Sequence, residues 1–260
     1  MNAAKERMAA GGLVLCMGLR QARSLDAVMI AGAAGFDSVY VDLEHSPLSL
    51  ETASVLCAGA PGVGVTPLVR VPSHAGDWIS RVLDGGAQGV IVPHVNSADE
   101  AAAVVRAARF PPVGHRSVGG SGPALGYRPI PLGEVNATLN RDTLVIVMIE
   151  TPQAVEAADA IAAVDGVDLL LIGSNDLCTE MGIPGQLRDP RLMQAYERVA
   201  AACAANGKWL GVGGVRGDAA LQARLLALDA RFLIAGNDVG YLAQAAGADV
   251  KTLRAVAPKR

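Results

Sequence analysis

The chain alternates short, strongly apolar runs with longer segments of helical spacing. The runs are rich in β-branched residues and almost unbroken, which is typical of strands buried on both faces of a parallel sheet. They cover residues 13–18, 37–42, 66–71, 88–93, 143–150, 167–176, 208–214 and 230–236. Because parallel strands need crossover connections, the pattern predicts an α/β fold.

Two α/β architectures fit this alternation: a closed barrel and an open doubly wound sheet. The number of runs, the absence of a glycine-rich dinucleotide turn after the first run and the length of 260 residues favour the barrel. We therefore predict a single (β/α)8 TIM-barrel domain over residues 1–260. Residues 111–142 are rich in glycine and proline, and we expect them to form a long loop near the site.

Composition excludes several classes of protein. Aromatic residues make up only 3% and the net charge is −3, so nucleic-acid binding is not expected. No apolar run reaches the roughly 18 residues that would span a bilayer, and no signal peptide is evident. The four cysteines show no metal spacing, which indicates a reducing compartment, the cytoplasm. Hydrophobic residues make up 51%, which suits a well-buried core or contacts between subunits of an oligomer.

Two carboxylates follow neighbouring runs of the predicted sheet. Glu150 ends the fifth run and Asp176 ends the sixth. Parallel neighbours lie about 5 Å apart, so both side chains can converge on one cation. Alone, either residue would more simply cap a helix or begin a turn, but the pair at matching ends favours a site for Mg²⁺ or Mn²⁺. With no histidine at local spacing, a zinc site is less favoured.

The second and third runs end in further polar residues. Arg70 ends a buried strand and must face a carboxylate, either of the protein or of a ligand. A structural salt bridge explains it almost as well as a donor to an enolate oxygen. His45 follows Asp42 and Glu44, either of which could fix its tautomer, and it is a candidate base or a hydrogen-bonded structural residue.

Residues at the opposite end of the barrel are expected to be structural. Asp84 precedes the fourth run, which places it on the amino-terminal face of its own subunit. The lysines also avoid the carboxyl ends of the runs, so Schiff-base chemistry has no candidate nucleophile. They are Lys5, Lys208, Lys251 and Lys259.

Several segments resemble the HpcH/HpaI class II pyruvate aldolases, from about residue 11 to 240. The segments are G-F-D-S-V-Y-V-D-L-E-H-S-P, P-L-V-R-V-P, L-D-G-G-A-Q-G-V-I-V-P-H-V, R-F-P-P-V-G-H-R-S-V-G, V-M-I-E-T and I-G-S-N-D-L. The resemblance implies a metal-dependent barrel that reversibly cleaves 4-hydroxy-2-oxo acids into pyruvate and an aldehyde.

The resemblance also implies roles for individual residues. Glu150 and Asp176 would hold the divalent ion, Mg²⁺ or Mn²⁺ with Co²⁺ possible. Arg70 would bind the 2-oxo oxygen and stabilise the enolate. His45, paired with Asp42 and acting through a metal-bound water, would move the proton.

The resemblance further implies a homohexamer, a trimer of dimers with a swapped last helix. Asp84 would then reach the His45 region of a neighbouring subunit. Backbone N–H groups of Ser174 and Asn175 would bind the pyruvate carboxylate. Three positions depart from the family pattern. Ser174 and Asn175 replace a Pro-Ala that is common in the family, Met148 replaces a common glutamine, and the strand-one aromatic of some members is missing. The aldehyde partner and the preferred reaction therefore stay open.

Two other functions are compatible with the sequence. The same metal and enolate would serve a lyase or decarboxylase of a dicarboxylic 2-oxo acid such as oxaloacetate. A catalytically inactive, metabolite-binding barrel is the third interpretation. It is disfavoured because Glu150, Asp176, Arg70 and His45 are all retained.

Overall fold

The computed structural model describes residues 2–256 and confirms the closed barrel. The strands run parallel in chain order, and β1 pairs with β8 to close the sheet. They are β1 (Val14–Leu19), β2 (Ser38–Asp42), β3 (Thr66–Arg70), β4 (Gly89–Val92), β5 (Leu144–Ile149), β6 (Leu169–Gly173), β7 (Trp209–Gly213) and β8 (Ala230–Asn237).

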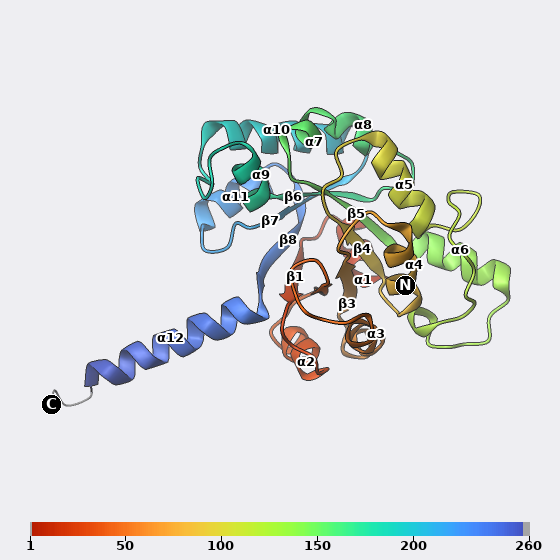
Figure 1. Ribbon diagram of the computed structural model, residues 1–260, viewed down its shortest axis with the longest axis horizontal. Coiled ribbons are helices and arrows are strands. Elements are labelled where there is room, and N and C mark those ends of the chain that lie inside the picture. The colour runs from red at the N-terminus through yellow and green to blue at the C-terminus, as the bar shows by residue number, and fades with distance from the viewer. Residues whose placement is uncertain (1, 257–260) are drawn as a thin grey trace.

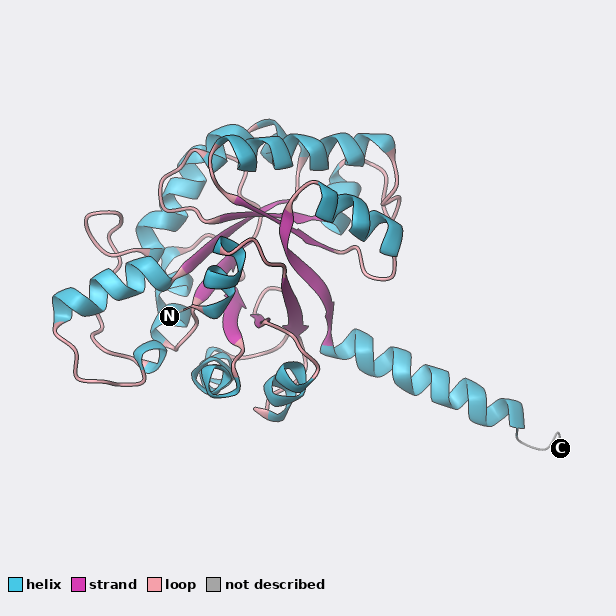
Figure 2. Cartoon of the chain, turned by 180° about the vertical axis from the view of Figure 1, so that it is seen from behind, coloured by secondary structure: helices cyan, strands magenta, loops and turns pink. Residues whose placement is uncertain are grey.

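Helices surround the strands (Figure 2). They are α1 (Ala3–Ala9), α2 (Asp26–Ala33), α3 (Leu50–Gly59), α4 (Gly76–Asp84), α5 (Ala98–Ala108), α6 (Leu132–Asp142), α7 (Pro152–Glu156), α8 (Ala158–Ala162), α9 (Ser174–Glu180), α10 (Pro190–Ala205), α11 (Ala219–Ala227) and α12 (Asp238–Val256), with short 3-10 turns η1 (Ala60–Val63) and η2 (Pro123–Leu125). None of the helices within residues 2–256 is long and apolar enough to cross a membrane.

Two hydrophobic clusters explain why the barrel is closed and filled. The larger one packs the outward side chains of the strands against the helices. The smaller one fills the barrel interior with side chains such as Leu68, Ile146 and Phe232. Tyr40 and Met148 belong to this interior cluster and also line the cavity above it. The packed interior therefore forms the floor of the site.

Residues 111–142 differ from the expected loop in two ways. Part of the segment is helical, because Leu132, Val135 and Leu139 recur at helical spacing and Val135 is buried. The segment also connects α5 to β5, so it lies at the amino-terminal end of the barrel. None of its residues lines the cavity of the same chain.

The last helix leaves the barrel instead of packing on it. In Figure 1, α12 extends away from the strands to the carboxyl terminus. None of its residues is buried, although Leu242 and Leu253 are apolar. By contrast, each of the longer helices α5 and α10 buries an apolar face.

Candidate active site at the carboxyl ends of the strands

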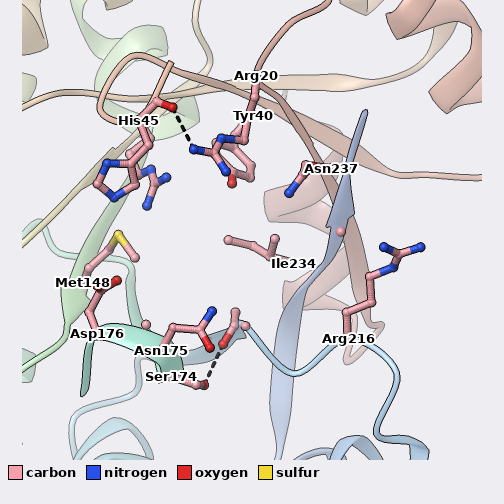
Figure 3. Close-up of a pocket in the computed structure, with 15 residues that line it drawn as sticks. Arg20, Tyr40, His45, Met148, Ser174, Asn175, Asp176, Arg216, Ile234 and Asn237 are labelled. Carbon is pink, nitrogen blue, oxygen red and sulfur yellow. Dashed lines mark hydrogen bonds between the residues drawn. The ribbon is translucent and has the colours of Figure 1, made fainter. Parts of the chain in front are cut away.

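A cavity of about 320 Å³ opens at the carboxyl ends of the strands (Figure 3). Its position is the one at which (β/α)8 enzymes carry their chemistry. The lining residues are Arg20, Tyr40, His45, Arg70, Met148, Gly173, Ser174, Asn175, Asp176, Gly213, Gly214, Arg216, Ile234, Gly236 and Asn237. No lysine within residues 2–256 lines it, and Lys259 lies outside the described residues.

Glu150 and Asp176 lie beside this cavity, and their carboxylates have few hydrogen-bond or ion-pair partners in the protein. Glu150 follows β5, is 1% exposed and accepts a hydrogen bond at Oε2 from the backbone N–H of His94 (2.9 Å). Its side chain crosses β6 at Gly173, where an added Cβ would lie 2.5 Å from Oε1. The Asp176 carboxylate has no hydrogen-bond or ion-pair partner within residues 2–256.

The pKa of Glu150 is raised to about 7, mainly by burial and also by the nearby charges of Asp176 and Glu44, against the opposing hydrogen bond and charge of His94. Two neighbouring carboxylates of this kind fit a hard divalent cation, which favours oxygen ligands. No group of three or more His, Cys, Asp or Glu side chains in the described chain is arranged so that it could hold a metal ion. The pair would therefore leave coordination positions for water and substrate.

Arg70 is fixed by the register of β2 and β3, which places it opposite Asp42. Its Nε and Nη2 donate to the two Asp42 oxygens at 3.1 and 2.7 Å, and Nη1 lies 3.0 Å from Glu44 Oε2. Burial alone would raise the pKa of Asp42, but the hydrogen bonds and charge of Arg70 lower it below its usual value. Arg70 is thus both ion-paired and part of the cavity wall.

His45 is held differently from the expected Asp42–imidazole pair. Asp42 Oδ1 accepts from the backbone N–H of His45 at 3.1 Å, whereas His45 Nε2 lies 3.6 Å from Glu44 Oε2. Because Arg70 and the backbone N–H groups of Glu44 and His45 already use the Asp42 oxygens, the imidazole faces Glu44. Glu44 is therefore the carboxylate that neighbours the candidate base.

Ser174, Asn175 and Met148 all line the cavity. The hydroxyl of Ser174 is used inside the fold, since it donates to Gly213 O (2.6 Å) and accepts from Tyr196 (2.8 Å). The hydroxyl has no donor left for an anionic ligand, so a hydrogen bond from Ser174 to a carboxylate would come from its backbone N–H. Met148 is only 4% exposed and contributes an apolar surface.

Comparison with known proteins identifies the family. The model of the HpcH/HpaI aldolase/citrate lyase family matches residues 19–245. The chain belongs to this family.

Similar proteins agree with the family assignment. A 4-hydroxy-4-methyl-2-oxoglutarate aldolase of Chaetomium globosum is 43% identical over 244 residues, 92% of this chain and 90% of its own. A hydroxypyruvate/pyruvate aldolase of Roseovarius nubinhibens is 37% identical over 85% of this chain and 84% of its own. The crystal structure of an HpcH/HpaI aldolase from Desulfitobacterium hafniense superposes with a TM-score of 0.92 at 33% identity, covering 98% and 97% of the two chains. The predictions of an aldolase and of a carbon–carbon lyase are confirmed.

Asp84 lies outside the cavity of its own HpcH/HpaI subunit. It ends α4, and its Oδ1 pairs with Arg116 Nη2 at 2.6 Å. The Asp84 side chain is 51% exposed, whereas that of Arg116 is 3% exposed. Within one subunit, Asp84 therefore does not contact the cavity, and its role stays a prediction.

His94 is a site residue that sequence reasoning missed. It follows β4 with φ +52° and lies between two acids, with Nδ1 3.4 Å from Glu150 Oε2 and Nε2 3.6 Å from Glu44 Oε1. Its position directly after an apolar run was the available signal. Arg20, Tyr40 and Arg216 also line the cavity and had no predicted role.

Proposed function

We propose that the protein is a divalent-metal-dependent aldolase that reversibly cleaves a 4-hydroxy-2-oxo acid into pyruvate, or a related 2-oxo acid, and an aldehyde. The observation that carries this proposal is the pair of carboxylates, Glu150 and Asp176, beside a cavity that Arg70 also lines. A cation held by the pair, Mg²⁺ or Mn²⁺ with Co²⁺ as an alternative, would act as a Lewis acid on the 2-oxo group.

The side chains supply the remaining chemistry. The 4-hydroxyl proton passes to a water near His45, the C3–C4 bond breaks, and its electrons form the pyruvate enolate while the aldehyde leaves. Arg70 donates to the enolate oxygen, where negative charge develops. Ser174 and Asn175 hold the 2-oxo acid carboxylate through backbone N–H groups, and the enolate carbon then takes up a proton to give pyruvate.

The exposed α12 supports assembly into a homo-oligomer. Its unburied apolar side chains, including Leu242, Val250 and Leu253, would pack on a neighbouring subunit. We extend the proposal to the hexamer built as a trimer of dimers, with Asp84 reaching the His45 region of a neighbour. Four free, buried cysteines support a cytoplasmic location.

Metal removal tests the proposed function. Chelation should abolish pyruvate release from 4-hydroxy-2-oxoglutarate, and Mg²⁺ or Mn²⁺ should restore it. Arg70→Ala in the reconstituted enzyme should lower kcat about a hundredfold, because an oxyanion donor is worth roughly 3 kcal/mol. Arg70→Lys keeps the positive charge but loses the two-point contact with Asp42. Its kcat should therefore lie between those of the wild type and Arg70→Ala. Activity that survives chelation, or a fully active Arg70→Ala variant, would contradict the proposal.

A further inference from the structure

Tyr40 presents an unused hydroxyl to the cavity. The residue lies on β2, is 6% exposed and lines the cavity, yet its Oη has no hydrogen-bond partner within residues 2–256. Its ring is fixed by the Arg70 guanidinium, whose Cζ lies 5.6 Å from the ring centroid, and by Gly18, where an added Cβ would lie 2.9 Å from Oη. The hydroxyl is open to the cavity and is not held by another side chain, so it can donate to an acceptor that arrives with a ligand.

Arg20 supplies a second donor on the same wall. It directly follows β1, and its Nη2 donates to the backbone oxygen of His45 (2.7 Å) while Nε lies 3.3 Å from Asp42 Oδ2. These contacts fix the guanidinium, whereas Nη1 has no partner in the described part of the chain. The fixed plane of the guanidinium suits recognition of a carboxylate.

The position of this pair decides which part of a substrate it can reach. Figure 3 shows Arg20 and Tyr40 on the far side of the cavity from Ser174 and Asn175. In the proposed function the 2-oxo acid carboxylate lies at Ser174 and Asn175. A substrate that extends across the cavity would therefore bring its aldehyde-derived end to Arg20 and Tyr40.

We infer that Arg20 and Tyr40 form a second anion subsite, which binds a carboxylate on the aldehyde-derived half of the substrate. This inference rests on the proposed function and narrows its substrate class to dicarboxylic 4-hydroxy-2-oxo acids. Both groups donate to the carboxylate, so the subsite selects the substrate and takes no part in the proton transfer. Burial raises the pKa of Tyr40 to about 12, so its phenol is protonated at neutral pH and acts as a hydrogen-bond donor.

The test compares two substrates of equal chain length. 4-Hydroxy-2-oxoglutarate ends in a carboxylate, and 4-hydroxy-2-oxopentanoate ends in a methyl group. The wild-type enzyme should favour the first in kcat/KM by at least about tenfold, the effect of a hydrogen bond to a charged group. Tyr40→Phe, which removes only Oη, should lower kcat/KM for the carboxylate substrate about tenfold and change that for the methyl substrate less than about threefold.

Arg20→Gln provides a second variant, since it keeps a donor but removes the charge, and it should reduce the preference further. Arg224→Gln is the matched control, because Arg224 pairs with Glu197 on the surface at 3.0 Å and should leave the preference unchanged. Equal cleavage of both substrates by the wild type, or an equal loss on both in Tyr40→Phe, would overturn the subsite while the aldolase proposal stands. No pyruvate from either substrate would overturn both.

Discussion

The two ends of the barrel treat buried charge in opposite ways. At the amino-terminal end, the Asp168 carboxylate is met by Lys5 Nζ (2.8 Å), Arg109 Nη2 (2.7 Å) and the backbone N–H of Val145 (2.8 Å). At the carboxyl-terminal end, Glu150 has one backbone hydrogen bond and a histidine nearby, and Asp176 has no hydrogen-bond or ion-pair partner within residues 2–256.

The difference separates charges that stabilise the fold from charges that are available to a ligand. A buried carboxylate without compensation destabilises the protein unless something else binds it. Arg109 shows the first case, since its donors reach the backbone oxygens of Gly166, Asn140 and Thr143 as well as Asp168. Glu150, with its raised pKa, shows the second. Incomplete pairing is therefore informative about function, and complete pairing about stability.

The largest effect on stability is expected at the amino-terminal end. Arg109→Met should lower the free energy of unfolding by about 3–5 kcal/mol, because it leaves a buried network without its cation. Urea denaturation followed by circular dichroism measures this, with Arg224→Met as the surface control. Activity per folded molecule should be unchanged at low temperature. A loss of activity without a loss of stability would contradict the conclusion that the paired charges at the amino-terminal end serve the fold alone.

A smaller effect of opposite sign is expected at the carboxyl-terminal end. Glu150→Gln should abolish activity yet stabilise the metal-free protein at pH 8 by up to about 3 kcal/mol, because its charged form is penalised by burial. Because the pKa of Glu150 is higher in the folded protein (about 7) than in the unfolded chain (near 4.5), its protonated form stabilises the fold at pH values below 4.5. This stability is lost as the pH rises through about 7. The gain from the substitution should therefore shrink towards pH 5.

Thermal unfolding of metal-free wild type and Glu150→Gln at the two pH values measures this gain. Asp168→Asn is the matched control, since it removes a carboxylate that is fully paired. It should destabilise the protein at pH 8. A destabilised Glu150→Gln variant at that pH would show that the Glu150 charge is compensated after all.

The smallest effect on stability is expected at Gly173 of β6, which the Glu150 side chain packs against. Gly173→Ala would place a Cβ 2.5 Å from Glu150 Oε1 and 2.8 Å from its Cγ, so the carboxylate must shift. We expect about 1 kcal/mol loss of stability and weaker binding of Mn²⁺, measured by calorimetry. Gly62→Ala is the control, because no heavy atom lies within 4 Å of its added Cβ. Unchanged Mn²⁺ affinity in Gly173→Ala would remove Glu150 from the ion site.

Local sequence patterns predicted the barrel and much of the site. Unbroken apolar runs identify strands that are buried on both faces, and a residue that follows such a strand falls at the carboxyl end of the sheet. For this reason Glu150, Asp176, Arg70 and His45 could be located beside one cavity before the fold was known. The helix Leu132–Asp142 was missed because nearby glycine and proline residues obscured its spacing.

The tertiary structure decided how these side chains are paired. Asp42 contacts the backbone of His45 and not its imidazole, because the register of β2 and β3 brings Arg70 onto its oxygens. His94 reaches Glu150 only because β4 and β5 are neighbours and its backbone adopts a positive φ. Sequence fixes which face and which end of a strand a residue occupies, since these depend on local periodicity. Which side chains then meet depends on strand register and barrel closure, which are set by contacts between segments far apart in the chain.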